Sequence, residues 1–210
     1  MVLPFSIFVG LFNAVSSLIN QVVIPYGYSE TQGGISAGIL IGSGLVSAAI
    51  TSPLNDRYKW YLGAIRLLVP ISGVMYLCLI YAPASSYGIW PTYLVCGILG
   101  ASSFSMLPIV LEYLAEVTYP YSPEIGSTLS WSAGQLFGGI FIIIQSQLTA
   151  SSTANPPYNM HKSLIFSAVV AMVFTPFPLA LSLVHRKVTQ RRLEFGQVVA
   201  TAENKGAIST

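Results

Sequence analysis

Long apolar stretches separated by short polar segments dominate the pattern of this sequence. Each stretch has about the 20 residues that an α-helix needs to cross the hydrocarbon of a bilayer. Apolar and polar positions do not alternate as they would in the strands of a membrane β-barrel. The pattern therefore predicts an all-α membrane protein in which residues 1–184 form six transmembrane helices. The predicted spans are residues 3–24, 34–54, 62–82, 90–116, 126–148 and 163–184.

The segments between the predicted spans contain the residues that favour turns. Tyr119-Pro120-Tyr121-Ser122-Pro123 and Asn155-Pro156-Pro157 are two of them. Proline and asparagine in such clusters mark loops. After the last span, residues 185–210 change abruptly to polar composition, which predicts a disordered cytoplasmic tail.

The composition supports a surface that faces lipid. Of the 210 residues, 53% are hydrophobic and only 8% are charged, whereas soluble proteins carry about 25% charged residues. A net charge of +2 without a basic face excludes nucleic acid as a partner. The lipid bilayer is therefore the first expected partner.

Lysine and arginine are distributed unequally between the two sides of the predicted membrane. Arg57, Lys59 and Arg66 flank the second loop and five further basic residues follow the last span, whereas only Lys162 lies on the other side. Cytoplasmic loops retain positive charge, so we expect both termini to be cytoplasmic. The pattern is equally compatible with the plasma membrane and an organelle membrane.

Polar side chains within the spans mark a candidate solute pathway. In the first span, Asn13 lies near mid-depth, with Asn20 and Gln21 closer to the outer end; in the fifth, Gln135 follows Trp131 by one helical turn. Polar groups at this depth are costly and either serve function or join helices. Residues four apart share a helix face, so Trp131 and Gln135 can face one cavity. We predict that these five residues bind substrate; for Asn13 and Gln135, hydrogen bonding between helices without a ligand is the alternative.

Charged residues gather at the predicted cytoplasmic side. Glu112 and Glu116 lie four residues apart on one face of the fourth helix, and Glu112 is about one turn inside the membrane. An ionised carboxylate at that depth needs a partner, and Asp56, Arg57 and Arg66 lie on the same side. We predict that these five residues form an ion-pair network that controls a gate; a static, solvated cluster is the alternative.

The sequence contains no arrangement that indicates catalysis or metal binding. His161 and His185 fall on opposite sides of the membrane, and Cys78 and Cys96 fall in different spans. A membrane hydrolase would need a clustered nucleophile and base. We therefore expect neither enzymatic activity nor a cofactor or metal site.

Glycine repeats at the spacing that favours close helix packing. The repeats are Gly34, Gly38 and Gly42 in the second span and Gly134 and Gly138 in the fifth. Small residues at this spacing let helix backbones approach one another. We assign all five to contacts between helices.

Several motifs resemble one transporter family. Asp56-Arg57, between the second and third spans, is similar to the Asp-Arg loop that major facilitator transporters carry in each six-helix half. Three segments resemble, in order, the carboxy-terminal half of the feline leukaemia virus subgroup C receptor-related (FLVCR) transporters. They are residues 13–21, 107–120 and 132–138, and the most specific is the Glu-x-x-x-Glu-x-Thr-Tyr-Pro stretch that begins at Glu112.

The resemblance implies one six-helix half of a major facilitator fold, which moves a small organic solute by alternating access between two halves. It implies a choline-like cation or a haem-related substrate, and it matches Gln135 to a cavity glutamine and Glu112 and Glu116 to paired glutamates. Choline-transporting members place at the position of Asn13 an aromatic residue, which suits cation–π contact. Asparagine cannot make that contact.

The expected function is transmembrane transport, with either a missing amino-terminal six-helix half or a second half-size chain as partner. A truncated product is favoured over a genuine half-size protein, because all three matching segments resemble the carboxy-terminal half. The alternative function is a non-transporting six-helix membrane protein that acts as a receptor or regulatory partner.

Overall fold

The computed structural model describes residues 2–58, 61–118 and 123–180. All the regular structure in this part of the chain is helical, and six helices are long and apolar enough to cross a membrane. They confirm the predicted six-helix membrane fold. The helices are α1 (Val2–Val23), α2 (Glu30–Tyr58), α3 (Tyr61–Tyr81), α4 (Trp90–Thr118), α5 (Pro123–Gln147) and α6 (His161–Phe174), with short 3-10 turns η1 (Ile24–Tyr26) after α1 and η2 (Ala82–Ala84) after α3.

The bounds of α2 and α6 differ most clearly from the predicted spans. α2 begins at Glu30 because Ser29 and Gln32 cap it reciprocally. The Ser29 backbone N–H donates to Gln32 Oε1 at 2.9 Å, and the Gln32 backbone N–H donates to Ser29 Oγ at 3.3 Å. α6 is interrupted after Phe174 by a turn at Thr175, because Pro176 has no backbone N–H to continue the helical hydrogen bonds. Residues 176–180 are helical again, so the apolar span runs from His161 to Ala180. The predicted tail, residues 185–210, lies outside the described residues.

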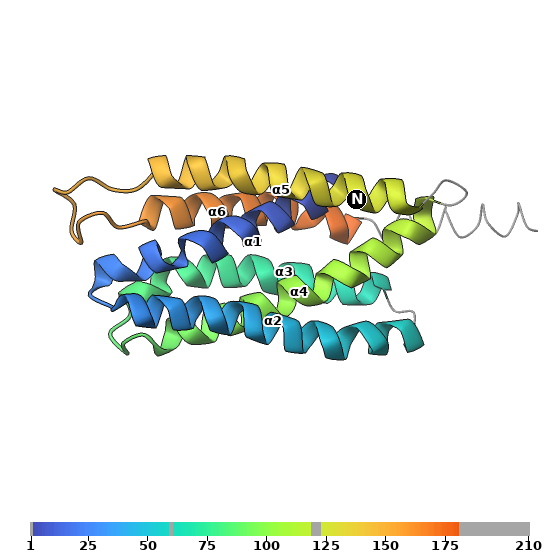
Figure 1. Ribbon diagram of the computed structural model, residues 1–210, viewed down its shortest axis with the longest axis horizontal. Helices are drawn as coiled ribbons and strands as arrows, with labels where there is room; N and C mark the ends of the chain where they lie inside the picture. Colours follow the sequence, from blue (N-terminus) through green and yellow to red (C-terminus); the bar gives the residue numbers. More distant parts are fainter. Residues whose placement is uncertain (1, 59–60, 119–122, 181–210) are drawn as a thin grey trace, which may run out of the picture. The chain divides into compact units, whose positions relative to one another are not determined.

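Residues up to Pro178 form one compact unit, and several of its helix contacts repeat when α1–α3 are exchanged with α4–α6, although the contact of α3 with α4 has only a weaker counterpart between α6 and α1. The main contacts of α2 with α4 and of α1 with α5 convert into each other under this exchange, and the contact of α3 with α6 converts into itself. In Figure 1, α1 and α4 both cross the bundle obliquely. This exchange is the arrangement of the inverted three-helix repeats that make up each half of a major facilitator transporter.

The contact between α2 and α4 is tight because small residues line it. A Cβ on Gly100 would collide with the carbonyl oxygen of Leu40. Further along, the hydroxyls of Ser47 and Ser105 lie 2.7 Å apart and share a hydrogen bond. The absence of a side chain at Gly100 therefore lets the two backbones approach closely.

The glycine repeat of α2 does not pack as its spacing predicted. Apart from the nearby backbone of α2 itself, no atom lies within 4 Å of a Cβ placed on Gly34, Gly38 or Gly42, and all three glycines are exposed. By contrast, Gly134 and Gly138 of α5 contact α1 as predicted. We refer to Gly34, Gly38 and Gly42 as the open α2 face, because no part of the described chain covers it.

Candidate functional site

The contact between α1 and α5 positions the candidate site. Ser6 Oγ on α1 donates to the carbonyl oxygen of Ser130 on α5 at 2.9 Å. One turn along, a Cβ on Gly134 would lie 2.7 Å from Val9 Cγ1. Since ordinary carbon–carbon contacts are about 3.5–4.0 Å, only glycine fits at this crossing. The two helices are therefore held at close range just before Asn13.

Asn13 and Gln135 meet immediately beyond this crossing. Asn13 Nδ2 donates to Gln135 Oε1 at 3.1 Å, which joins residues 122 positions apart in the sequence. Gly138 leaves room for the bond, because a Cβ there would lie 3.1 Å from Asn13 Cβ and 3.2 Å from Asn13 Nδ2. Asn13 is half-buried and Gln135 is exposed, so the pair lies at the surface of the bundle near the middle of both helices.

The pair leaves hydrogen-bonding groups for a ligand. In the described residues, neither Asn13 Oδ1 nor Gln135 Nε2 makes a further hydrogen bond. An amide carries one acceptor oxygen and one NH₂ group. Whichever amide donates, their mutual bond therefore leaves one carbonyl oxygen and one NH₂ group exposed. The pair carries no charge.

Trp131 lies one helical turn before Gln135 on α5. Its side chain is 44% exposed. Residues four apart on a helix share a face, so Trp131 and Gln135 lie on the same exposed face of α5. An exposed indole face can contact an apolar group or a cation. Trp131, Gln135 and Asn13 form one surface of the bundle, which we call the wall. They give it an aromatic ring, a hydrogen-bond donor and a hydrogen-bond acceptor.

α1 changes from buried to exposed near Asn13. Residues 4–11 are all buried, whereas Ser17 and Gln21, which follow Asn13 at four-residue steps, are exposed. Side chains at this spacing follow one another along a helix surface. We call these three residues the α1 polar strip. It leads from the amide pair to the end of the bundle where α1 ends, and Ser17 is a member that the sequence interpretation missed although the four-residue spacing contains it.

Asn20 contacts α2 and not the α1 polar strip. A Cβ on Gly33 of α2 would collide with Asn20 Oδ1. This oxygen is buried and has no hydrogen-bond partner in the described residues. Because a Gly33 Cβ would overlap this oxygen, it lies against the Gly33 backbone, where a Cα–H group can contact it weakly. The structure therefore places Asn20 in the packing of α1 on α2.

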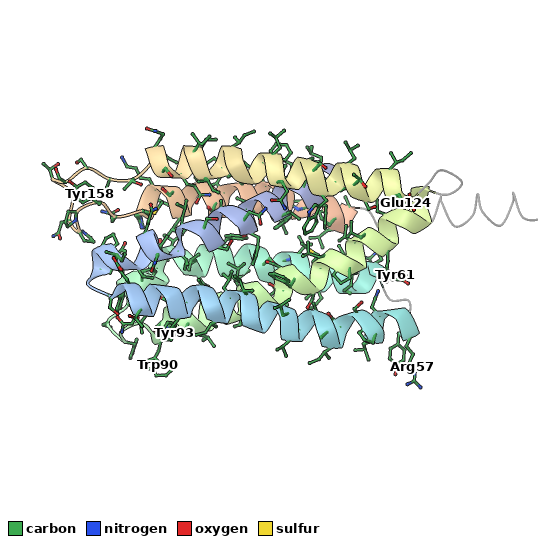
Figure 2. The ribbon with its side chains drawn as sticks, in the orientation of Figure 1. Arg57, Tyr61, Trp90, Tyr93, Glu124 and Tyr158 are labelled. Carbon is green, nitrogen blue, oxygen red and sulfur yellow. The ribbon has the colours of Figure 1, made fainter. Side chains whose placement is uncertain are left out.

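The two ends of the bundle differ in their side chains (Figure 2). Arg57, Tyr61 and Glu124 lie at one end, whereas Trp90, Tyr93 and Tyr158 lie at the other. At the second end, the rings of Trp90 and Tyr93 pack edge to face, with their centroids 5.9 Å apart. We call the first end the basic end and the second the aromatic end. The α1 polar strip reaches the aromatic end.

The predicted gate residues belong to the basic end. Glu112 is half-buried in α4, whereas Arg57 and Arg66 are exposed. No ion pair within 4.0 Å joins either arginine to a carboxylate in the part of the chain that the structure describes. The side chains of Asp56 and Glu116 lie outside the described residues. The ion-pair network stays a prediction.

Metal-binding chemistry is not apparent at either end. Among residues 2–58, 61–118 and 123–180, no group of three or more His, Cys, Asp and Glu side chains could hold a metal ion. The chemistry of the described site is thus that of neutral amides, hydroxyls and an indole.

No protein-family model matches the chain. It is 30% identical over 152 residues to the choline/ethanolamine transporter flvcr2b of Danio rerio, across 72% of this chain and 31% of that protein. It is also 30% identical over 158 residues to the human choline/ethanolamine transporter FLVCR2, across 74% of this chain and 30% of that protein. An uncharacterised protein of Caenorhabditis elegans is 26% identical over 204 residues, across 88% of this chain and 40% of that protein. The chain thus matches only 30 to 40% of the length of these relatives.

Proposed function

Because the chain is related to the FLVCR-like choline/ethanolamine transporters, we propose that it forms one half of a transporter for a small organic solute. The observation that supports this most is the Asn13–Gln135 pair, which exposes amide groups near the middle of α1 and α5. Much of the remaining exposed surface consists of leucine, isoleucine and valine. Polar groups at membrane depth are costly unless they face protein, water or a ligand. The mutual hydrogen bond of the pair leaves one carbonyl oxygen and one NH₂ group free, and a solute pathway gives these two groups such a partner.

Transport proceeds by alternating access in this proposal. Trp131, Gln135 and Asn13 form one wall of the cavity, and a second six-helix half forms the opposite wall. The α1 polar strip, through Ser17 and Gln21, gives the solute a hydrated route to the aromatic end. The charged residues at the basic end close the solute's route to that end. Rocking of one half against the other then opens the route to each end in turn.

The second half docks partly on the open α2 face. Gly34, Gly38 and Gly42 are exposed, with no atom outside the nearby α2 backbone within 4 Å of a Cβ at any of them. A helix of another six-helix half can approach the α2 backbone closely there. The partner is a missing amino-terminal half or a second half-size chain. Arg57 and Arg66 are exposed at the basic end, so the positive-inside rule makes that end cytoplasmic, together with both termini.

Uptake measurements test the proposal. The chain is expressed in cells alone and together with the part of zebrafish flvcr2b that precedes its matched region, and uptake of labelled choline and ethanolamine is followed. We expect uptake when both parts are present and a several-fold loss with Gln135→Ala. Gln147→Ala is the matched control, because Gln147 is an exposed glutamine at the end of the same helix.

Two outcomes contradict the proposal at different points. Uptake that Gln135→Ala leaves unchanged removes Gln135 from the solute site. No uptake of either solute, with both parts inserted in the membrane, contradicts transport and favours the receptor or regulatory function.

A further inference from the structure

The hydrogen bond between Asn13 and Gln135 decides what the site offers to a ligand. It uses one amide oxygen and one amide N–H. One carbonyl oxygen and one NH₂ group remain, and the neighbouring indole of Trp131 can only donate from its N–H. Because Asn13 donates the bond, the carbonyl that remains is Asn13 Oδ1. It is the acceptor that the wall offers to the polar end of a solute.

Organic cations differ in how they use such a carbonyl. A protonated amine that keeps an N–H loses hydrogen bonds to water when it enters a cavity, and a carbonyl oxygen restores one of them. A quaternary ammonium has no N–H and gains most from an aromatic face. An amide carbonyl therefore favours the first kind of cation over the second.

The wall can also bind the hydroxyl end of a small amino alcohol. The remaining NH₂ group of the pair donates, so it can bind a hydroxyl oxygen of the same solute. Because the two free groups belong to adjacent amides joined at 3.1 Å, a ligand with its donor and acceptor two or three bonds apart can contact both.

We propose that the Asn13–Gln135 pair selects protonated amines that bear at least one N–H together with a nearby hydroxyl, in preference to quaternary ammonium ions. This selection rests on the proposed transport function, since it assigns the substrate class of the same wall. Asn13 is then the residue that determines specificity, and Gln135 both orients it and binds the hydroxyl.

A series of ligands with stepwise N-methylation tests the selection. Ethanolamine, its N-methyl and N,N-dimethyl derivatives and choline carry three, two, one and no N–H groups when cationic. Each competes with labelled ethanolamine in the uptake assay with both parts present. The first three should inhibit within a few-fold of one another, and choline should be weaker by about tenfold or more, equivalent to about 1.4 kcal/mol. A smooth trend through all four, or equal inhibition by choline, overturns the proposal.

Variants separate hydrogen bonding from the larger size of choline. Asn13→Leu together with Gln135→Leu removes both amide carbonyls at similar volume, so the step between dimethylethanolamine and choline should disappear. A step that persists in this double variant is steric and overturns the role of the amide pair. Gln147→Ala, which alters an exposed glutamine at the far end of α5, should leave the step unchanged. The series on the unaltered chain provides a result even where the double variant fails to fold.

A binding measurement keeps this proposal distinct from the transport proposal. The chain has three tryptophans, so Trp60→Phe with Trp90→Phe leaves Trp131 as the sole tryptophan, excited at a wavelength that the tyrosines do not absorb. The complete chain in lipid nanodiscs is titrated with the same four ligands. A fluorescence response that drops at choline supports the selection even without uptake, whereas uptake of all four ligands with no step overturns the selection and leaves transport standing. No response to any of the four overturns the selection.

Discussion

Gly10→Ala should break the Asn13–Gln135 hydrogen bond without touching either amide. A Cβ on Gly10 would lie 2.8 Å from Phe137 Cβ and 3.0 Å from the backbone nitrogen of Gly138. Ordinary carbon–carbon contacts begin at about 3.5 Å, so α1 and α5 must separate locally by about 0.7 Å. The same shift would lengthen the hydrogen bond between Asn13 Nδ2 and Gln135 Oε1 from 3.1 Å to about 3.8 Å, well beyond the usual range for N–H···O hydrogen bonds.

The effect on stability has two opposing contributions. Overpacking a close contact costs about 1–3 kcal/mol, whereas replacing glycine by alanine within a helix contributes about 1 kcal/mol in its favour. We therefore expect a net destabilisation of about 1 kcal/mol. The coupling between Asn13 and Gln135 should be about 0.6 kcal/mol, the average for hydrogen bonds between membrane helices.

A double-mutant cycle measures this coupling directly. The free energy of unfolding in mixed micelles is determined for Asn13→Ala, Gln135→Ala and the double variant, each with and without Gly10→Ala. We expect the coupling energy to fall to near zero in the presence of Gly10→Ala. Gly38→Ala is the control, because no atom outside the nearby α2 backbone lies within 4 Å of its Cβ. Coupling that survives Gly10→Ala, or that Gly38→Ala abolishes equally, would refute the reasoning.

Three further predictions concern other contacts. Gly33→Ala should lower the free energy of unfolding, because its Cβ would collide with Asn20 Oδ1, and the added change Asn20→Ala should recover most of the loss; no recovery would contradict the contact. Tyr76→Phe should leave stability unchanged or raise it by about 1 kcal/mol in the same assay, since it removes a hydroxyl that has no partner in the described residues, on a side chain 1% exposed. Alanine at all three glycines of the open α2 face should not destabilise the chain alone but should reduce its co-purification with the other half; unchanged co-purification would place the docking surface elsewhere.

The six helices were predictable because each is a long apolar run, but the start of α2 needed a finer signal. The span prediction began at Gly34, since Glu30 and Gln32 are polar. The Ser-x-x-Gln pattern from Ser29 is a capping box, and it was present in the sequence. Polar residues at a helix start therefore belong to the helix when they can satisfy its free N–H groups.

The amides of the site were predictable as residues, but not as a pair. Membrane depth singles out Asn13 and Gln135, whereas nothing in one sequence joins positions 122 residues apart. On α1, Ser17 and Asn20 lie within about 60° of each other around the helix axis. The contact with Gly33 of α2 decides that Asn20 packs and Ser17 is exposed.

Glycine spacing predicts that a helix can pack closely against another helix, but not which helix that is. The same four-residue spacing occurs in the open α2 face and at Gly134 and Gly138, yet only the latter two meet a neighbour in the described chain. Which face of a helix a motif occupies depends on the tilt of the helix and on the neighbours that remain available. Those are properties of the assembled bundle.

The partial exchange symmetry of the bundle gives two related helix crossings that differ in role. One helix crossing occurs twice, with Gly10 at the contact of α1 with α5 and Gly100 at the contact of α4 with α2. Near the second crossing, Ser47 and Ser105 bond to each other and hold the helices together. Near the first, amides face outward. Because one crossing supplies cohesion, substitutions near the other can change the exposed amides without loosening the helices that Ser47 and Ser105 join.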